Sequence, residues 1–386
     1  MGKMTIEQIQ SNESIRLTEF PVAEKTTYLA HAAVCPLPSC ARDAILHYAA
    51  ACVNGDQEDF TPPSLLRNTR QLAAKLIGAK MKEIALVGPT SLGLSFIAQG
   101  LDWQSGDNII INADDYPSNV YPWMALKEKG VKLKYLKPHE PGRIEPENVF
   151  ELIDSRTRMA ALASCHYVSG YRINIDAIGQ ELRSRGILFC VDGIQTVGAF
   201  PTSVEHVDFL AADAHKWMLG PCASGILYVK YETQKQLKPI VQGWHNLLCP
   251  DFIAQETLNY KQDGRRYEAG TANLLGIVGH HASLAMLNDL GVNNIATDLL
   301  NKRNLLIPEL LSKGYHVLNS DGDLDNASGI VTFHKPNNDM SKLVAKLEQA
   351  RIKVSLRFMR DGSKLIRLSP HFYNTANELN RLLDKL

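Results

Sequence analysis

Short apolar runs alternate with longer amphipathic segments between about residues 84 and 230. The apolar runs are IALV (84–87), NIIIN (108–112), VKLKYL (131–136), RMAALA (158–163), ILFCV (187–191) and GILYV (225–229). The segment at 174–186 lies between two of these runs and places Ile175, Ile178 and Leu182 at helical spacing. Strands that alternate with helices in this way predict an α/β layer around a mostly parallel sheet.

The pattern changes after about residue 275. LLGIVGHHASLAMLNDLG predicts a long helix that Gly291 closes, and a second helix is expected to end at Ser312. Strands are then predicted at 329–334, 353–357 and 364–369, with helices at 339–350 and 375–385. We therefore expect an N-terminal arm at 1–20, a large α/β domain at 21–270 and a small C-terminal α+β domain at 271–386.

Charge and cysteine content argue against several classes of protein. The chain has 41 Lys plus Arg and 41 Asp plus Glu, so it lacks the basic excess of a nucleic-acid-binding protein. Its seven cysteines are scattered without a CxxC pair, which predicts neither a metal site nor a disulfide framework and fits a reducing cytosol. The N-terminus lacks an apolar signal core, and no stretch approaches the roughly 18 apolar residues of a membrane span. We expect a cytoplasmic protein with no nucleic-acid or membrane partner.

Two stretches carry the strongest chemical signal. Asp192 stands in VDGIQ at the carboxyl end of an apolar strand, where open α/β sheets bind ligands, and Lys216 stands in HKWMLGP. Alone, Asp192 is also typical of a helix cap and Lys216 of a protein surface. Together they match pyridoxal phosphate, which needs a lysine for a Schiff base and an acid that keeps its ring nitrogen protonated.

With YLAHAAVCPLP at 28–38 and LIRLSPHFYNT at 365–375, these motifs make the chain resemble the class V aminotransferases over nearly its whole length. That group of fold-type I pyridoxal-phosphate enzymes also holds cysteine desulfurases, selenocysteine lyases, kynureninases and isopenicillin N epimerase. The resemblance implies a large domain with a mostly parallel, seven-stranded type of sheet, a small C-terminal domain and bound pyridoxal phosphate.

The resemblance also implies roles around the cofactor ring. Lys216 would bind the cofactor and later move the Cα proton of the substrate, which requires a lowered pKa. Asp192 would pair with the ring nitrogen, Gln195 would donate to O3′, and Tyr116 would stack on the ring. Ser169 follows a strand end in the region that touches the O3′ side in relatives, as does His166.

Further residues are expected near the cofactor phosphate. Thr90 and Ser91 follow the strand at 84–87 and open a helix, where they would bind the phosphate, although both residues are also ordinary helix caps. His215 would be a further donor, and the anionic Asp213 is expected to orient His215 or a neighbouring residue. Thr271 would reach the phosphate of a neighbouring subunit, which implies a homodimer with shared active sites. A domain-junction turn explains the region of Thr271 equally well.

An amino-acid substrate needs a group that binds its carboxylate. Arg367 lies in an Arg-x-Ser element on a predicted strand and would hold this carboxylate through two hydrogen bonds. Arg357 is expected to have a structural role. His31 is expected to line the substrate pocket, together with His245 and Asn246.

The cofactor motifs leave the reaction open. Cysteine desulfurases carry a nucleophilic cysteine on the loop before the Arg-x-Ser element, but the loop at 358–363 has none and Cys249 is the last cysteine. Cys222 follows Lys216 and is more typical of a small packing residue. We therefore expect transamination first, then a C–S or C–N lyase, then epimerisation. A non-catalytic binding protein is a further alternative, against which the presence of both Lys216 and Asp192 argues.

Overall fold

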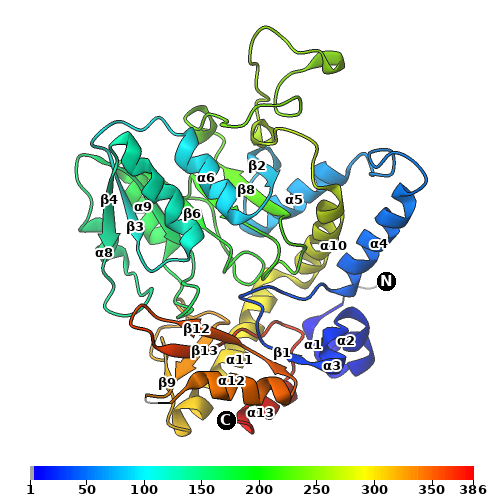
Figure 1. Ribbon diagram of the computed structural model, residues 1–386, viewed down its shortest axis with the longest axis vertical. Coiled ribbons are helices and arrows are strands. Elements are labelled where there is room, and N and C mark those ends of the chain that lie inside the picture. Colours follow the sequence, from blue (N-terminus) through cyan, green and yellow to red (C-terminus); the bar gives the residue numbers. More distant parts are fainter. Residues whose placement is uncertain (1–3, 337) are drawn as a thin grey trace.

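A computed structural model describes residues 4–336 and 338–386, so the first three residues of the predicted N-terminal arm lie outside it. Figure 1 shows a large region built around a central sheet, with a smaller region of strands and helices below it. Helices and strands alternate along the large region, so the predicted α/β fold is confirmed.

The central sheet has seven strands. In spatial order they are β2 (Ile84–Val87), β8 (Gly225–Val229), β7 (Phe209–Ala212), β6 (Leu188–Asp192), β5 (Thr157–Ala163), β3 (Asn108–Asn112) and β4 (Lys132–Leu136). Only β8 runs antiparallel to its neighbours, so the sheet is mostly parallel, as expected. The sequence predicted β7 only as a strand that ends near Leu210, whereas it continues to Ala212 and pairs with both β6 and β8.

Helices cover both faces of this sheet. One face carries α5 (Leu65–Ile77), α9 (Ile175–Ser184) and α10 (Leu274–Leu290), and the other carries α6 (Thr90–Gly100) and α7 (Tyr121–Met124). Alternate residues of one strand enter different cores, as Ile110 does on the first face and Ile109 and Ile111 on the second. Burial on both faces explains why the strands are continuous apolar runs.

Helix α6 lies very close to the sheet. A Cβ atom added to Gly93 would be 2.9 Å from the Cβ of Ala211 on β7, so a larger residue would push the helix away. At the start of the helix, the backbone N–H of Asp213 donates to Oγ1 of Thr90 at 2.9 Å. This packing places the N-terminus of α6 beside the segment that follows β7.

The C-terminal part has the predicted α+β character. Helix α11 (Val292–Ser312) follows α10 after Gly291, and a four-stranded sheet has the order β12 (Ser355–Phe358), β13 (Lys364–Leu368), β10 (Val331–His334), β9 (His316–Val317). Helices α12 (Met340–Gln349) and α13 (Ala376–Leu383) pack with this sheet in a third apolar core. The strand predicted at 353–357 is divided, because β11 (Ile352–Lys353) pairs instead with β1 (Thr27–Tyr28).

The N-terminal segment is helical. It contains α1 (Ile6–Ser11), α2 (Glu13–Glu19) and α3 (Val22–Lys25), followed by α4 (Ser39–Cys52). Arg16 forms a buried ion pair with Glu378 of α13 at 3.1 Å, which ties this segment to the C-terminal region. Helix α10 packs on α4 and α5, and Leu29 enters the core of the small region. The domain boundary near residue 270 stays a prediction.

The remaining elements are short. Helix α8 spans Pro146–Phe150, and 3₁₀ helices span Met81–Glu83, Pro117–Asn119, Ala125–Lys129, Thr233–Lys235, Pro250–Phe252 and Gly264–Tyr267. Figure 1 shows the segment between β8 and α10 extending outward at the top of the view. Among the described residues, no helix combines the length and apolar character needed to cross a bilayer.

Candidate active site

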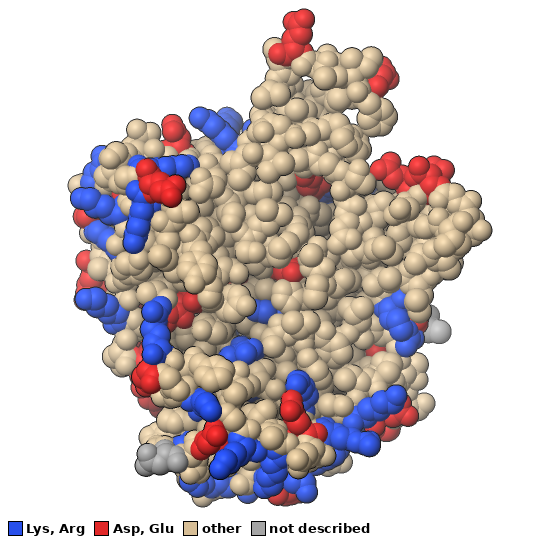
Figure 2. All heavy atoms as spheres, in the orientation of Figure 1, with Lys and Arg blue, Asp and Glu red and all other residues tan. Residues whose placement is uncertain are grey.

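The carboxyl ends of the parallel strands open onto a cavity of about 390 Å³ that the small region helps to close. Eight of the predicted site residues line it: Thr90, Ser91, Tyr116, Asp192, Gln195, His215, Lys216 and Arg367. Figure 2 shows this face of the molecule hollowed near its middle, with a few charged atoms among uncharged surroundings. The fold therefore brings together in one cavity residues that lie far apart in the sequence.

Lys216 lies on the loop after β7 and is 6% exposed. Burial lowers the pKa of its amine to about 8, and the positive charges of Arg367 and Arg357 act in the same direction, while Asp192 opposes them. Its Nζ atom is 5.3 Å from the centre of the Tyr116 ring. A lowered pKa leaves part of the amine uncharged near neutral pH, which is the form that attacks a carbonyl carbon.

Asp192 ends β6 and is buried in the cavity wall. Its Oδ1 accepts a hydrogen bond from the backbone N–H of Ile194 at 3.0 Å, and Oδ2 has no hydrogen-bond partner among the described residues. Burial raises the pKa of this carboxyl, against the lowering effects of the Ile194 N–H and of Lys216. A buried carboxylate with one free oxygen fits a protonated ring nitrogen, as pyridoxal phosphate requires.

His215 is held by a buried carboxylate. Oδ2 of Asp213 accepts from His215 Nδ1 at 2.6 Å and from the backbone N–H of Ala223 at 3.1 Å. Burial would raise the pKa of Asp213, but the hydrogen bonds from His215 and from backbone N–H groups lower it. Asp213 therefore orients His215, one of the two roles expected for it, and Nε2 of that ring is left for the cavity.

The start of α6 provides donors for an anion. The backbone N–H groups of Thr90 and Ser91 open the helix and have no acceptor within it. The Thr90 hydroxyl accepts from Asp213, so its own hydrogen is free to be donated. These donors, the positive end of the helix dipole and His215 on the same cavity wall fit the phosphate of the cofactor.

Gln195 and Tyr116 complete the part of the wall around the cofactor ring. Gln195 Oε1 accepts from Trp217 Nε1 at 2.8 Å and its Nε2 donates to the Ala32 carbonyl at 3.1 Å, so one amide N–H remains for a ligand. Tyr116 is 48% exposed, and its ring meets the Tyr167 ring edge-on, with 5.4 Å between the centroids. An exposed aromatic face beside Lys216 matches the stacking role predicted for Tyr116.

Arg367 lies on β13 and its side chain is fully buried. Nη1 donates to the Tyr167 carbonyl, whereas Nε and Nη2 have no partner among the described residues. Nε and Nη2 are the adjacent pair of N–H groups that binds a carboxylate side-on. Burial lowers the pKa of Arg367, and the charge of Arg357 lowers it further. A buried guanidinium with this pair free is a site for a carboxylate.

The structure does not bring Ser169 and His31 to this cavity. Ser169 is buried against His166, whose Nδ1 lies 3.2 Å from the serine Oγ and whose Nε2 lies 3.0 Å from the Asp114 carbonyl oxygen. His31 is buried with both ring nitrogens occupied, by the Ser369 carbonyl at 2.9 Å and the Tyr373 hydroxyl at 2.8 Å. The expectation that His31 contacts the substrate is therefore wrong, because its ring bonds to Ser369 of the Arg-x-Ser element and to Tyr373 instead.

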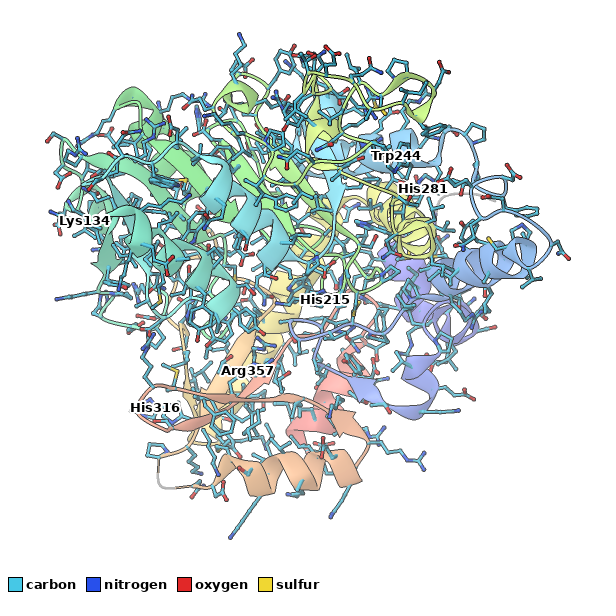
Figure 3. All side chains as sticks on the ribbon, turned by 45° about the horizontal axis from the view of Figure 1, so that its top comes forward. Lys134, His215, Trp244, His281, His316 and Arg357 are labelled. Carbon is cyan, nitrogen blue, oxygen red and sulfur yellow. The ribbon has the colours of Figure 1, made fainter. Side chains whose placement is uncertain are left out.

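Thr271, His245 and Asn246 also lie outside the cavity. Thr271 is exposed and shares a separate hollow with Trp244 and His245. Asn246 is buried and donates to two backbone carbonyls, those of Val241 and Arg266. Figure 3 shows Trp244 apart from His215 and Arg357. Within one chain, this group of residues does not contact the cavity that contains Lys216.

Two polar cavity residues, Ser118 and Tyr167, escaped the sequence analysis, and the role of Arg357 was misjudged. Tyr167 and Ser118 line the wall; Tyr167 directly follows His166 after β5, a position that could have signalled it. Arg357 was expected to be structural but also lines the cavity. Strand pairing explains why Arg357 reaches the cavity. Ser355 lies opposite Arg367, so Arg357 is the diagonal neighbour of Arg367 on the same face of the sheet.

Comparison with known protein families identifies the family of this chain. The family model described as aminotransferase class-V matches residues 27–382. The chain belongs to the class V aminotransferase family. It is therefore a pyridoxal-phosphate-dependent enzyme, as the resemblance implied. Among the described residues, no group of three or more His, Cys, Asp or Glu side chains could hold a metal ion.

Relatives within this family carry two kinds of name. A probable cysteine desulfurase of Methanothermobacter thermautotrophicus is 27% identical over 339 residues, which cover 83% of this chain and 82% of the relative. An uncharacterized aminotransferase of Bacillus subtilis, YcbU, is 27% identical and covers 81% of this chain and 80% of its own. A cysteine desulfurase of Escherichia coli is 28% identical, with coverages of 83% and 81%.

Solved structures share the fold. The apo structure of a cysteine desulfurase from Thermococcus onnurineus NA1 has a TM-score of 0.87 and 22% identity, and the match covers 95% of each chain. The cystine C–S lyase C-DES, solved with its product cysteine persulfide, has a TM-score of 0.83 and 22% identity over 95% of this chain and 98% of its own. At these identities the likeness supports the fold alone.

Proposed function

We propose that this enzyme uses pyridoxal phosphate bound to Lys216 to act at the Cα of an amino acid, with transamination as the first candidate reaction. The observation that carries the proposal is Arg367, whose buried guanidinium has Nε and Nη2 free and lines the same cavity as Lys216. A carboxylate on this fork would place the substrate in the cavity that holds the reacting groups.

When bound, pyridoxal phosphate supplies an electron sink that makes the Cα proton of the amino acid acidic. Lys216 then removes and returns this proton, a task that suits an amine with a pKa of about 8. Asp192 keeps a proton on the ring nitrogen. Thr90, Ser91 and His215 hold the phosphate, and Gln195 donates to O3′.

A lyase that breaks a C–S or C–N bond is the second candidate. The relatives named as cysteine desulfurases favour it. Among the described residues, no cysteine lines the cavity around Lys216, and the loop from Phe358 to Ser363 contains none. A lyase reaction here would therefore release its sulfur product directly, without a persulfide on the enzyme.

A screen of single amino acids decides between these reactions. We expect stoichiometric pyridoxamine phosphate when the holoenzyme is mixed with its amino-acid substrate and no acceptor, because transamination stops at that stage. Ammonia and sulfide, assayed in the same samples, report the lyase reaction. Catalytic release of ammonia with no pyridoxamine phosphate would reject transamination, and a persulfide on any enzyme cysteine would contradict direct release.

Replacing Asp192 by Asn should slow removal of the Cα proton at least tenfold while the cofactor still binds covalently. The amide cannot hold the ring nitrogen protonated, and losing an ionic hydrogen bond costs on the order of 1.5–3 kcal/mol. Stopped-flow measurement of hydrogen–deuterium exchange at Cα checks this. Near-normal exchange in Asp192→Asn would show that Asp192 only accepts the hydrogen bond from the Ile194 N–H and does not serve the cofactor.

We further propose that the enzyme is a cytoplasmic homodimer in which Thr271 reaches the cofactor phosphate of the partner subunit. Thr271 is exposed and lies outside the cavity of its own chain. Near it in sequence, Phe252 is 78% exposed and Ile253 63%, on the segment that extends from the body in Figure 1. Apolar side chains exposed on an extended segment favour burial against a second copy.

A further inference from the structure

Two arginines with free N–H groups face the same cavity. Arg357 on β12 and Arg367 on β13 are diagonal neighbours on one face of the small sheet, at a typical Cα separation of about 7–8 Å. Arg357 donates Nη1 only to the carbonyl of the preceding Leu356, and its Nε is buried without a partner. Figure 3 shows Arg357 on the side of the small region that faces His215.

The side chains that line the cavity carry more positive than negative charge around Arg357 and Arg367. Among the described residues that line it, Asp192 is the only carboxylate, and the proposed function assigns it to the cofactor ring. Burial lowers the pKa of Arg357, the phenols of Tyr167 and Tyr116 act in the opposite direction, and no carboxylate is among these causes. Asp114, in the loop after β3, is paired with Arg360. A single substrate carboxylate on Arg367 would leave Arg357 without an anion.

We infer that Arg357 binds a second carboxylate, so that the substrates of this enzyme are amino acids or 2-oxo acids with an acidic side chain. The inference rests on the proposed function, in which Arg367 holds the α-carboxylate. The planar fork of a guanidinium matches a carboxylate well, and Arg357 and Arg367 line the same cavity of about 390 Å³.

The surroundings of Arg357 favour a carboxylate over a phosphoryl group. A phosphate site of this fold uses several backbone N–H groups and hydroxyls together, as the start of α6 offers at Thr90 and Ser91. Around Arg357 the cavity wall presents mainly the aromatic rings of Tyr116 and Tyr167. One guanidinium near two phenol rings suits a group that accepts two parallel hydrogen bonds.

Calorimetric titration of the holoenzyme with unreactive acids tests this inference without relying on turnover. Succinate is compared with butyrate, and glutarate with valerate, because each pair has the same number of carbon atoms and differs by one carboxylate. We expect at least one dicarboxylate to bind ten times more tightly than its monocarboxylate partner. In Arg357→Gln this preference should fall at least fivefold, and Arg357→Lys should retain part of it.

Lys364→Gln is the matched control, because it removes a positive charge from the same β12–β13 hairpin at an exposed position paired with Asp339. It should leave the preference unchanged. A wild-type enzyme without any preference, or an Arg357→Gln variant that keeps it, overturns the inference and leaves the proposed function standing. If Arg367→Gln changes the binding of neither class of acid, the proposed function itself fails.

One further titration separates the two kinds of second anion. 3-Phosphonopropionate has a chain similar to that of succinate but carries a phosphonate at one end. Weaker binding than that of succinate supports a second carboxylate. Tighter binding, lost in Arg357→Gln, overturns the carboxylate assignment in favour of a phosphorylated substrate.

Discussion

Replacing Lys216 by Ala is expected to reduce turnover by roughly 10³-fold or more, the largest effect of any single change in this enzyme. General acid–base catalysis alone contributes about 10²–10⁴-fold, and in the proposed function Lys216 also binds the cofactor covalently. Steady-state assays with the best amino acid from the substrate screen measure the loss. Lys235→Ala, which removes an exposed lysine of a short 3₁₀ helix, is the control and should behave like the wild type.

Borohydride reduction tests the same residue by a different method. The reduced cofactor should be found on the peptide that contains Lys216, and on no peptide of the Lys216→Ala variant. Attachment of the cofactor to the apoenzyme should become faster from pH 6 to about 8 and then level off, because the uncharged amine is the reactive form and the pKa is about 8. Label on another lysine of the wild type would contradict the assignment.

Replacing Arg367 by Lys should raise the KM for amino acids strongly while the cofactor remains bound. Lysine keeps the charge but loses the two parallel N–H groups, which a rigid strand holds in place through the buried neighbours Ile366 and Leu368. Replacement by Ala should cost roughly 2–5 kcal/mol in apparent substrate binding, because the pair is desolvated. Each 1.4 kcal/mol corresponds to a tenfold loss of affinity.

An amine that lacks a carboxylate is the control for Arg367. Its reaction should hardly respond to either substitution, because it never occupies the guanidinium. The absorbance of the bound cofactor should also stay unchanged in both variants. Equal losses for the amine and for the amino acid would show that Arg367 supports the structure, for example through the Tyr167 carbonyl, and Arg357 would become the candidate for the α-carboxylate.

Most strands were predictable because they are buried on both faces. The run at 108–112, with Ile109, Ile110 and Ile111, is too apolar for a surface and too short for a core helix, and it forms β3. The strand β7 was only partly predicted, since FLAA lacks β-branched residues and depends on its pairing with β6 and β8. The split of 353–357 into β11 and β12 depends on Thr27 and Tyr28, which lie more than 300 residues earlier.

The cofactor part of the site could also be predicted from local motifs. Lys216, Asp192 and the start of α6 each follow a strand, and the carboxyl ends of parallel strands meet at one edge of a sheet. Their positions after these strands therefore predict that they lie close together. The same reasoning gave wrong predictions for Ser169 and His31, because proximity to a strand end does not say whether a side chain points toward the cavity or into the core.

By itself, the sequence determined the α/β class, the family and the cofactor, because these follow from apolar patterns and short motifs along the chain. The same motifs led to the proposed roles of Lys216 and Asp192. Only the tertiary structure decided how the substrate end of the cavity is built. Arg357 and Arg367 are ten positions apart, and only the antiparallel pairing of β12 with β13 places them on one face toward Lys216. Strand register and the packing of the small region on the large one are long-range properties, which no local pattern of residues specifies.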